Sequence, residues 1–68
     1  MHSRNVDFEV VLEIFESHGW KLGKTWGEYR VFVKEGELPW MIPVENRKVD
    51  FEYVTKIRIF FGIEGEAR

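Results

Sequence analysis

Apolar side chains recur with a helical period near the beginning of the chain. The residues at positions i, i+3, i+4 and i+7 of this segment are Phe8, Val11, Leu12 and Phe15. Such spacing places all four side chains on one face of a helix, which we expect to run from Val6 to Ser17. Ser3 or Asn5 is a suitable N-cap for this helix, and Gly19 is suited to end it in the left-handed conformation.

Beyond Gly19 the period changes to two residues, which is typical of half-buried strands. The three segments with this pattern are Trp20–Lys24, Tyr29–Lys34 and Leu38–Ile42. Short turns at Gly27-Glu28 and Glu35-Gly36-Glu37 separate them, so we expect consecutive strands to pair in antiparallel fashion. Pro39 and Pro43 lack the backbone donor that a central strand needs, so the third strand is expected to be short or to lie at an edge.

A polar connection, Val44 to Val49, leads into a second segment with helical period. Asp50 is its expected N-cap and Gly62 its expected end. The apolar stripe between them consists of Phe51, Val54, Ile57 and Phe61. The predicted fold class is therefore α+β with the order α-β-β-β-α: a three-stranded antiparallel sheet with two helices packed on one face. The other face of the sheet is left exposed or covered by a partner.

The composition favours a single folded domain without disulfides. The chain has 68 residues, of which 44% are hydrophobic, and it contains six Phe, three Trp and two Tyr but no Cys. We expect one folded domain over residues 1–68, with an ordered core at about 6–63, a frayed tail from Glu64 to Arg68 and no disulfide. No long apolar run and no signal-peptide core occur, so the expected location is the cytoplasm, without a membrane segment. His2 and His18 lie too far apart for metal-ligand spacing, and no cofactor motif is present, so we expect neither a metal nor a cofactor.

Charge is unevenly distributed along the chain. Ten basic and twelve acidic side chains give a net charge of −2, which disfavours a protein that is basic over its whole surface. Basic side chains are nevertheless in excess between Trp20 and Lys34 and between Asn46 and Arg58. This excess predicts a local patch that binds RNA phosphates, with aromatic side chains that stack on bases. The candidate RNA-binding residues are Lys24, Trp26, Tyr29, Arg30, Lys34, Arg47 and Lys48.

Four short motifs, spread over residues 6–63, resemble one protein family. They are His18-Gly19-Trp20 at the end of the first helix, Gly27-Glu28-Tyr29-Arg30-Val31-Phe32, Ile42-Pro43, and Val54-x-x-Ile57 followed by Gly62-Ile63. In order and spacing they are similar to the HicA-type (YcfA-like) toxins of bacterial toxin–antitoxin modules. The resemblance implies a fold like that of double-stranded-RNA-binding domains, and a toxin that cuts messenger RNA with a histidine at the start of the second strand.

Tyr29 stands at the position of that family histidine, and Val44 and Glu45 follow Pro43 where a second family histidine is often found. A phenol ordinarily loses its proton near pH 10 and an imidazole near 6.5, so tyrosine is a poor general base at neutral pH. The resemblance therefore predicts a HicA-like RNA-binding domain that is catalytically degenerate and has no catalytic residue. Strand alternation groups Tyr29 with Val31 and Val33; if that set faces the core, Arg30 and Lys34 lie on the open face.

Two other functions stay open at this point. The first is a protein-interaction module of the same fold, which pairs with itself as a homodimer or binds an antitoxin-like partner. Its motivation is the apolar surface beyond what one core needs, at Trp26, Trp40, Tyr53 and Phe60. The second is a small endonuclease that uses Glu28 or Glu45 with Arg30, since a carboxylate acts as a base when burial raises its pKa.

Overall fold

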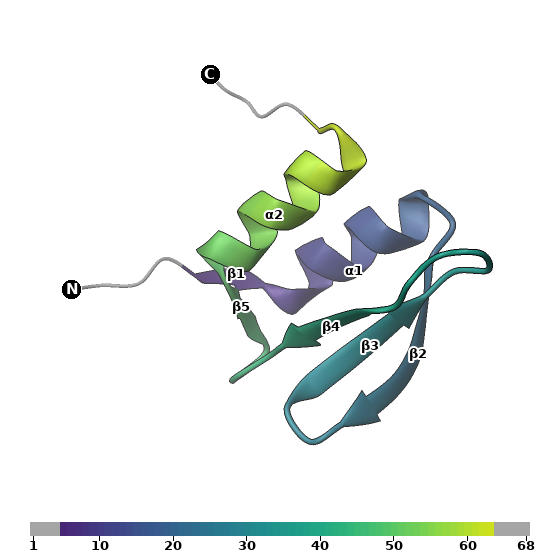
Figure 1. Ribbon diagram of the computed structural model, residues 1–68. Helices are drawn as coiled ribbons and strands as arrows, with labels where there is room; N and C mark the ends of the chain where they lie inside the picture. Colours follow the sequence, from purple (N-terminus) through teal and green to yellow (C-terminus); the bar gives the residue numbers. More distant parts are fainter. Residues whose placement is uncertain (1–4, 64–68) are drawn as a thin grey trace.

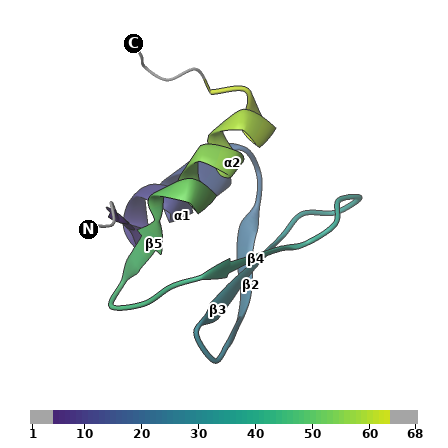
Figure 2. The ribbon, with the colours of Figure 1, turned by 60° about the vertical axis from the view of Figure 1, so that its left-hand side comes forward.

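The protein is described from a computed structural model over residues 5–63. Two helices and five strands are arranged in two layers (Figure 1). In chain order they are β1 (Asn5–Asp7), α1 (Phe8–Ser17), β2 (Lys21–Trp26), β3 (Tyr29–Val33), β4 (Trp40–Pro43), β5 (Lys48–Asp50) and α2 (Phe51–Phe61). The predicted α+β class is confirmed, because β2, β3 and β4 form an antiparallel sheet with both helices on one side of it (Figure 2). The predictions for His2, Ser3 and the tail 64–68 lie outside the described residues.

Helix α1 buries the face that its sequence period predicts. Val11 and Phe15 are completely buried, and Gly19 follows the helix with a φ of 87°, in the left-handed region. The predicted beginning at Val6 and the predicted cap at Asn5 are wrong, because these two residues belong to β1. Asp7 occupies the N-cap position, but its side chain forms no capping hydrogen bond. Its carboxylate pairs with Lys48 instead.

A small second sheet replaces part of the polar connection expected at Val44 to Val49. Strand β5 pairs antiparallel with β1, with Val6 opposite Val49, and the side chain of Val49 is fully buried. A two-residue turn at Asn46 and Arg47 leads into β5, with φ values of 56° and 64°. Asp50 does precede α2 as predicted, although its side chain makes no capping hydrogen bond. This sheet ties the beginning of α1 to the beginning of α2.

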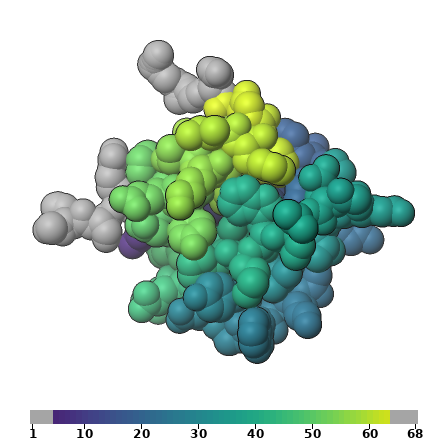
Figure 3. Space-filling view, in the orientation of Figure 1, coloured from purple at the N-terminus to yellow at the C-terminus, as the bar shows by residue number. Residues whose placement is uncertain are grey.

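The three-stranded sheet has the predicted order β2-β3-β4, with shifted strand ends. Strand β2 begins at Lys21 and extends to Trp26, and β4 begins only at Trp40, after Pro39. The register between β2 and β3 shifts at Gly23, where β2 carries a β-bulge. The loop between β3 and β4 contains the predicted turn at Glu35–Glu37 and projects from the body of the protein (Figure 3).

Aromatic side chains make up the centre of the core between the sheet and the helices. The ring of Phe15 stacks on the ring of Phe32, with 4.1 Å between centroids. It meets the rings of Trp20, Trp40 and Phe61 edge to face, at 5.4, 5.9 and 5.2 Å. Trp20 therefore packs against α1. This packing covers the centre of one face of the sheet.

Candidate binding surface on the open face of the sheet

The two faces of the sheet are distinguished by alternation along β3. Phe32 is fully buried against α1, and the guanidinium carbon of Arg30 lies 5.9 Å from the ring centroid of Phe8. Both side chains are therefore on the helix-covered face, and their neighbours Tyr29, Val31 and Val33 point to the opposite side. Alternation along the strand left two arrangements open, and the structure excludes the one in which Tyr29 borders the core and Arg30 lies on the open face.

Residues directly opposite each other on antiparallel strands share a face of the sheet. The register pairs Tyr29 with Trp26 and Pro43, Val31 with Lys24 and Met41, and Val33 with Lys21. These eight residues form what we call the open face: Lys21, Lys24, Trp26, Tyr29, Val31, Val33, Met41 and Pro43. Their side chains include four large apolar groups with substantial exposure, from 37% at Tyr29 to 65% at Trp26. The side chain of Trp26 is therefore available to a ligand or partner.

The bulge at Gly23 decides which lysines belong to the open face. In a regular strand, Lys21 and Lys24 would lie on opposite faces of the sheet. Because the bulge inserts Gly23 as an extra residue between them, both lysines lie on the open face. A Cβ at position 23 would lie 3.2 Å from both methyl groups of Val33 and 3.3 Å from the carbonyl oxygen of Val31. Glycine thus permits the close approach of the two strands. Lys21 was missed as a candidate from sequence, and the signal that indicates it is a glycine inside a strand.

The candidate RNA-binding residues are divided among several surfaces. Lys24, Trp26 and Tyr29 share the open face, whereas Arg30 lies on the helix-covered face. Lys34 lines a pocket with Lys21 and Val33 at one end of the open face, and its Nζ donates to the carbonyl oxygen of His18 at 3.0 Å. The other two are elsewhere: Lys48 Nζ pairs with Asp7 at 2.6 Å, and Arg47 belongs to the turn before β5. The continuous basic patch that the sequence predicts is therefore not formed.

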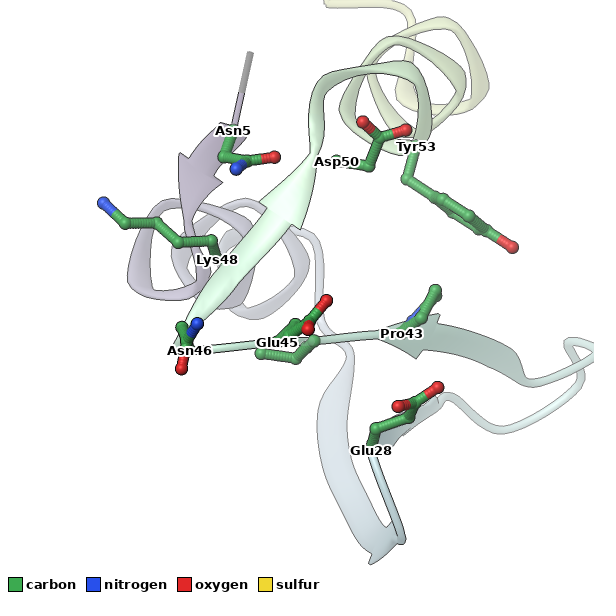
Figure 4. A pocket seen from close by; sticks show the side chains of 9 residues that line it. Asn5, Glu28, Pro43, Glu45, Asn46, Lys48, Asp50 and Tyr53 are labelled. Carbon is green, nitrogen blue, oxygen red and sulfur yellow. The ribbon is translucent and has the colours of Figure 1, made fainter. Parts of the chain in front are cut away.

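An acidic pocket of about 580 Å³ lies beside the open face, between the β2–β3 turn, β5 and α2. The side chains of Glu28, Glu45 and Asp50 line it together with the ring of Tyr53 (Figure 4). The ammonium group of Lys48 points away from these carboxylates and toward Asp7. Glu28 and Glu45 are both exposed. Their predicted partner in an endonuclease, Arg30, is not among the lining residues, so the geometry gives that function no support.

His18, the one histidine between residues 5 and 63, serves the end of α1. Its ring stacks on Phe61 with 4.2 Å between centroids, and its Nδ1 lies 2.8 Å from the carbonyl oxygen of Ile14. Since Nδ1 donates to that carbonyl, the 3.3 Å approach of Ser17 Oγ to the same nitrogen does not activate the hydroxyl. The described residues contain no group of three side chains suited to hold a metal ion.

The length and composition of the helices, together with comparisons with known proteins, add two findings. Within residues 5–63, neither helix has the length and apolar character that a bilayer crossing requires. The sequence matches no protein-family model, and searches of curated proteins and of solved structures gave no significant match. The open face and its neighbouring pocket are therefore interpreted from their own chemistry.

Proposed function

We propose that this protein is a HicA-like domain that acts by binding a partner protein through the open face of its sheet. One observation carries the proposal: a sheet face with a largely exposed tryptophan, a tyrosine, a methionine and two valines is left uncovered by the chain's own helices. Exposed apolar surface of this extent is typical of interaction sites on soluble domains. Tryptophan, tyrosine and methionine are also the residue types that are enriched in protein interfaces.

Trp26 is the expected anchor of this interface. Its side chain is 65% exposed, and it faces Tyr29 directly across the two strands. Interface tryptophans that become fully desolvated contribute most of the binding energy, and truncation to alanine commonly costs 2 kcal/mol or more, which is about 30-fold in affinity.

The resemblance to HicA-type toxins supports the same surface. The position that corresponds to the family's catalytic histidine is Tyr29, which lies on the open face. A partner seated there covers that position, as expected for an antitoxin-like protein that holds a toxin-type domain. With tyrosine at this position, binding rather than RNA cleavage is the proposed activity.

Site-specific photo-crosslinking tests this proposal in the cells that naturally produce the protein. We would replace Trp26 with p-benzoylphenylalanine, and in a matched control replace Glu13, which is exposed on the outer side of α1. The expected result is one defined protein adduct from position 26, none from position 13, and loss of the adduct in a Val33→Asp background. A partner captured equally from both positions, or only RNA captured from position 26, would refute the proposal.

RNA binding is the second candidate function, and the cluster of Lys21, Lys24, Trp26 and Tyr29 favours it. Aromatic side chains on an exposed sheet stack on unpaired bases, and adjacent lysines neutralise phosphates. Two lysines predict a slope of about −1.4 for log affinity against log salt with single-stranded RNA, whereas the five cations of the sequence prediction require about −3.5.

That slope is measured by filter binding between 50 and 200 mM salt, with a Tyr29→His variant scored for cleavage in parallel. Binding that disappears in Trp26→Ala and follows the shallow slope would support RNA as the ligand of the open face. Cleavage by Tyr29→His alone would show that only the histidine is missing. No binding even at 50 mM salt would remove this candidate.

A further inference from the structure

We infer that the element of the partner that seats on the open face is an amphipathic helix with acidic side chains along one flank, lying parallel to β2 and β3. The inference rests on the proposed function, because it names the partner's contact element at the same site.

Apolar and basic side chains form two parallel rows on the open face. Val33, Val31 and Tyr29 run down β3, and Lys21 and Lys24 run down the neighbouring β2 at the levels of Val33 and Val31. Neither lysine forms an ion pair with any other residue between 5 and 63. A surface that covers the apolar row therefore has to accommodate two uncompensated positive charges at one flank, and carboxylates are the groups that do so favourably.

The spacing of these rows matches a helix. Lys21 and Lys24 face positions two residues apart on β3, which corresponds to about 6.7 Å along the strand. Carboxylates at positions i and i+4 of an α-helix are separated by about 6.0 Å along the helix axis. The apolar row from Val33 to Tyr29 spans about 13 Å, the length of about nine helical residues, so apolar residues at i, i+4 and i+8 cover it.

The β2 edge of the sheet, which lies beside the two lysines, argues against a partner that adds a strand there. The outer edge of β2 is interrupted by the bulge at Gly23 and carries Lys21 and Lys24, and both features are common protections against edge pairing. The face itself has no such protection. Since the opposite face is already covered by two helices of the chain, a third helix completes a layered arrangement of helices on both sides of a sheet.

The chain itself carries an acidic helix, which makes a second copy the competing occupant. Glu9, Glu13 and Glu16 are exposed on α1, but Val10 is the one large apolar side chain beside them with more than a third of its surface exposed. A single valine does not cover the apolar row. Docking of α1 onto the open face of another copy is also a head-to-tail contact, which produces open chains unless the rotation closes a ring.

Selection from a displayed peptide library tests the inference. The library consists of 14-residue peptides with leucine fixed at positions i, i+4 and i+8 and with the flanking positions randomised. It is selected separately against the full-length protein, against a Lys21→Glu/Lys24→Glu variant, and against a Glu13→Lys control whose substitution lies on α1. We expect enrichment of Asp and Glu at one flank with the wild-type protein and the control, and of Lys and Arg with the double variant.

Binding measurements on one selected acidic peptide complete the test. We expect at least a tenfold loss of affinity for the double variant, and a similar loss when a central peptide residue is replaced by proline. Binders without acidic enrichment, binders that tolerate proline, or no binders at all would overturn the helix inference while leaving the crosslinking test of the proposed function intact. Peptides that bind a Val33→Asp variant as tightly as the wild type would lie outside the open face and would also overturn the helix inference. Concentration-dependent assembly of the protein alone, displaced by the acidic peptide, would identify the second copy as the occupant.

Discussion

Replacing Arg47 with glycine is expected to stabilise the protein. Arg47 and Asn46 are the two central residues of the turn before β5, and their φ values of 64° and 56° lie in the left-handed region. The backbone groups of the flanking residues bond to each other, from Glu45 N to Lys48 O at 3.0 Å and from Lys48 N to Glu45 O at 2.9 Å. This is the geometry of a type I′ turn, for which asparagine followed by glycine is the most favourable sequence.

The magnitude follows from two opposing terms. A side-chain-bearing residue in the left-handed region costs about 1–2 kcal/mol. Glycine removes that strain, but it also increases the conformational entropy of the unfolded chain, which lowers the stability of the fold by about 0.4–1 kcal/mol. The net gain for Arg47→Gly is therefore about 1 kcal/mol, which raises the Tm of a domain of this size by about 4–8 °C. The bond from Phe8 N to the carbonyl oxygen of Arg47, at 2.8 Å, involves only backbone atoms and is retained.

Urea unfolding followed by tryptophan fluorescence measures this change, since Trp20 is almost completely buried. With a slope of about 1 kcal/mol per molar urea, the midpoint should rise by about 1 M. The matched control is Glu35→Gly, an exposed turn position without a positive φ, where glycine should lower the stability. If Arg47→Gly is no more stable than the wild type, or is destabilised like Glu35→Gly, the strain argument is refuted.

Two further predictions concern the core and the β1–β5 sheet. Phe15→Ala should lower the free energy of unfolding by about 3–5 kcal/mol, which is comparable to the total of about 3–10 kcal/mol expected for a domain of this size. Circular dichroism should therefore show an unfolded chain at room temperature. The control Phe60→Ala removes a half-exposed ring and should leave the protein folded. The hydrogen bond and charge of Lys48 lower the pKa of Asp7 below its ordinary value of 3.8. The pair therefore stabilises the fold above that value and loses its effect as the pH falls through the folded-state pKa. Thermal melts between pH 6 and 2 should show a smaller loss of Tm in Lys48→Met than in the wild type, and equal losses would contradict the assignment.

The spacing of apolar residues correctly predicted α1 and α2, because each of these helices buries one face against the core. Val11 and Phe15 of α1, and Val54 and Ile57 of α2, are buried as their spacing requires. Strand β5 and its turn were missed because the usual signal of a type I′ turn, glycine at the second central position, is absent: Arg47 stands there. With only three residues each, β1 and β5 are also too short to show a period. Their pairing joins segments that are far apart in the sequence, which no local pattern reports.

The candidate site was predicted only in part. Trp26 and Tyr29 were recognised by residue type, and their direct pairing on an exposed face follows from the register of β2 and β3. The face on which Arg30 lies was left open, because alternation specifies two faces but not which one the helices cover. Lys21 was missed because the bulge at Gly23 reverses the alternation in β2.

The sequence by itself determined the fold class, the two helical faces and the order of the main sheet. These features depend on the spacing of apolar side chains and on residue identity, which are local properties of the chain. Only the tertiary structure decided which charged and aromatic side chains lie together. A shift of one residue in a strand moves a side chain to the other face, and this shift depends on contacts between distant segments. The bulge at Gly23 and the packing of Phe32 on Phe15 are the contacts that direct Lys21, Lys24, Trp26 and Tyr29 to one exposed face.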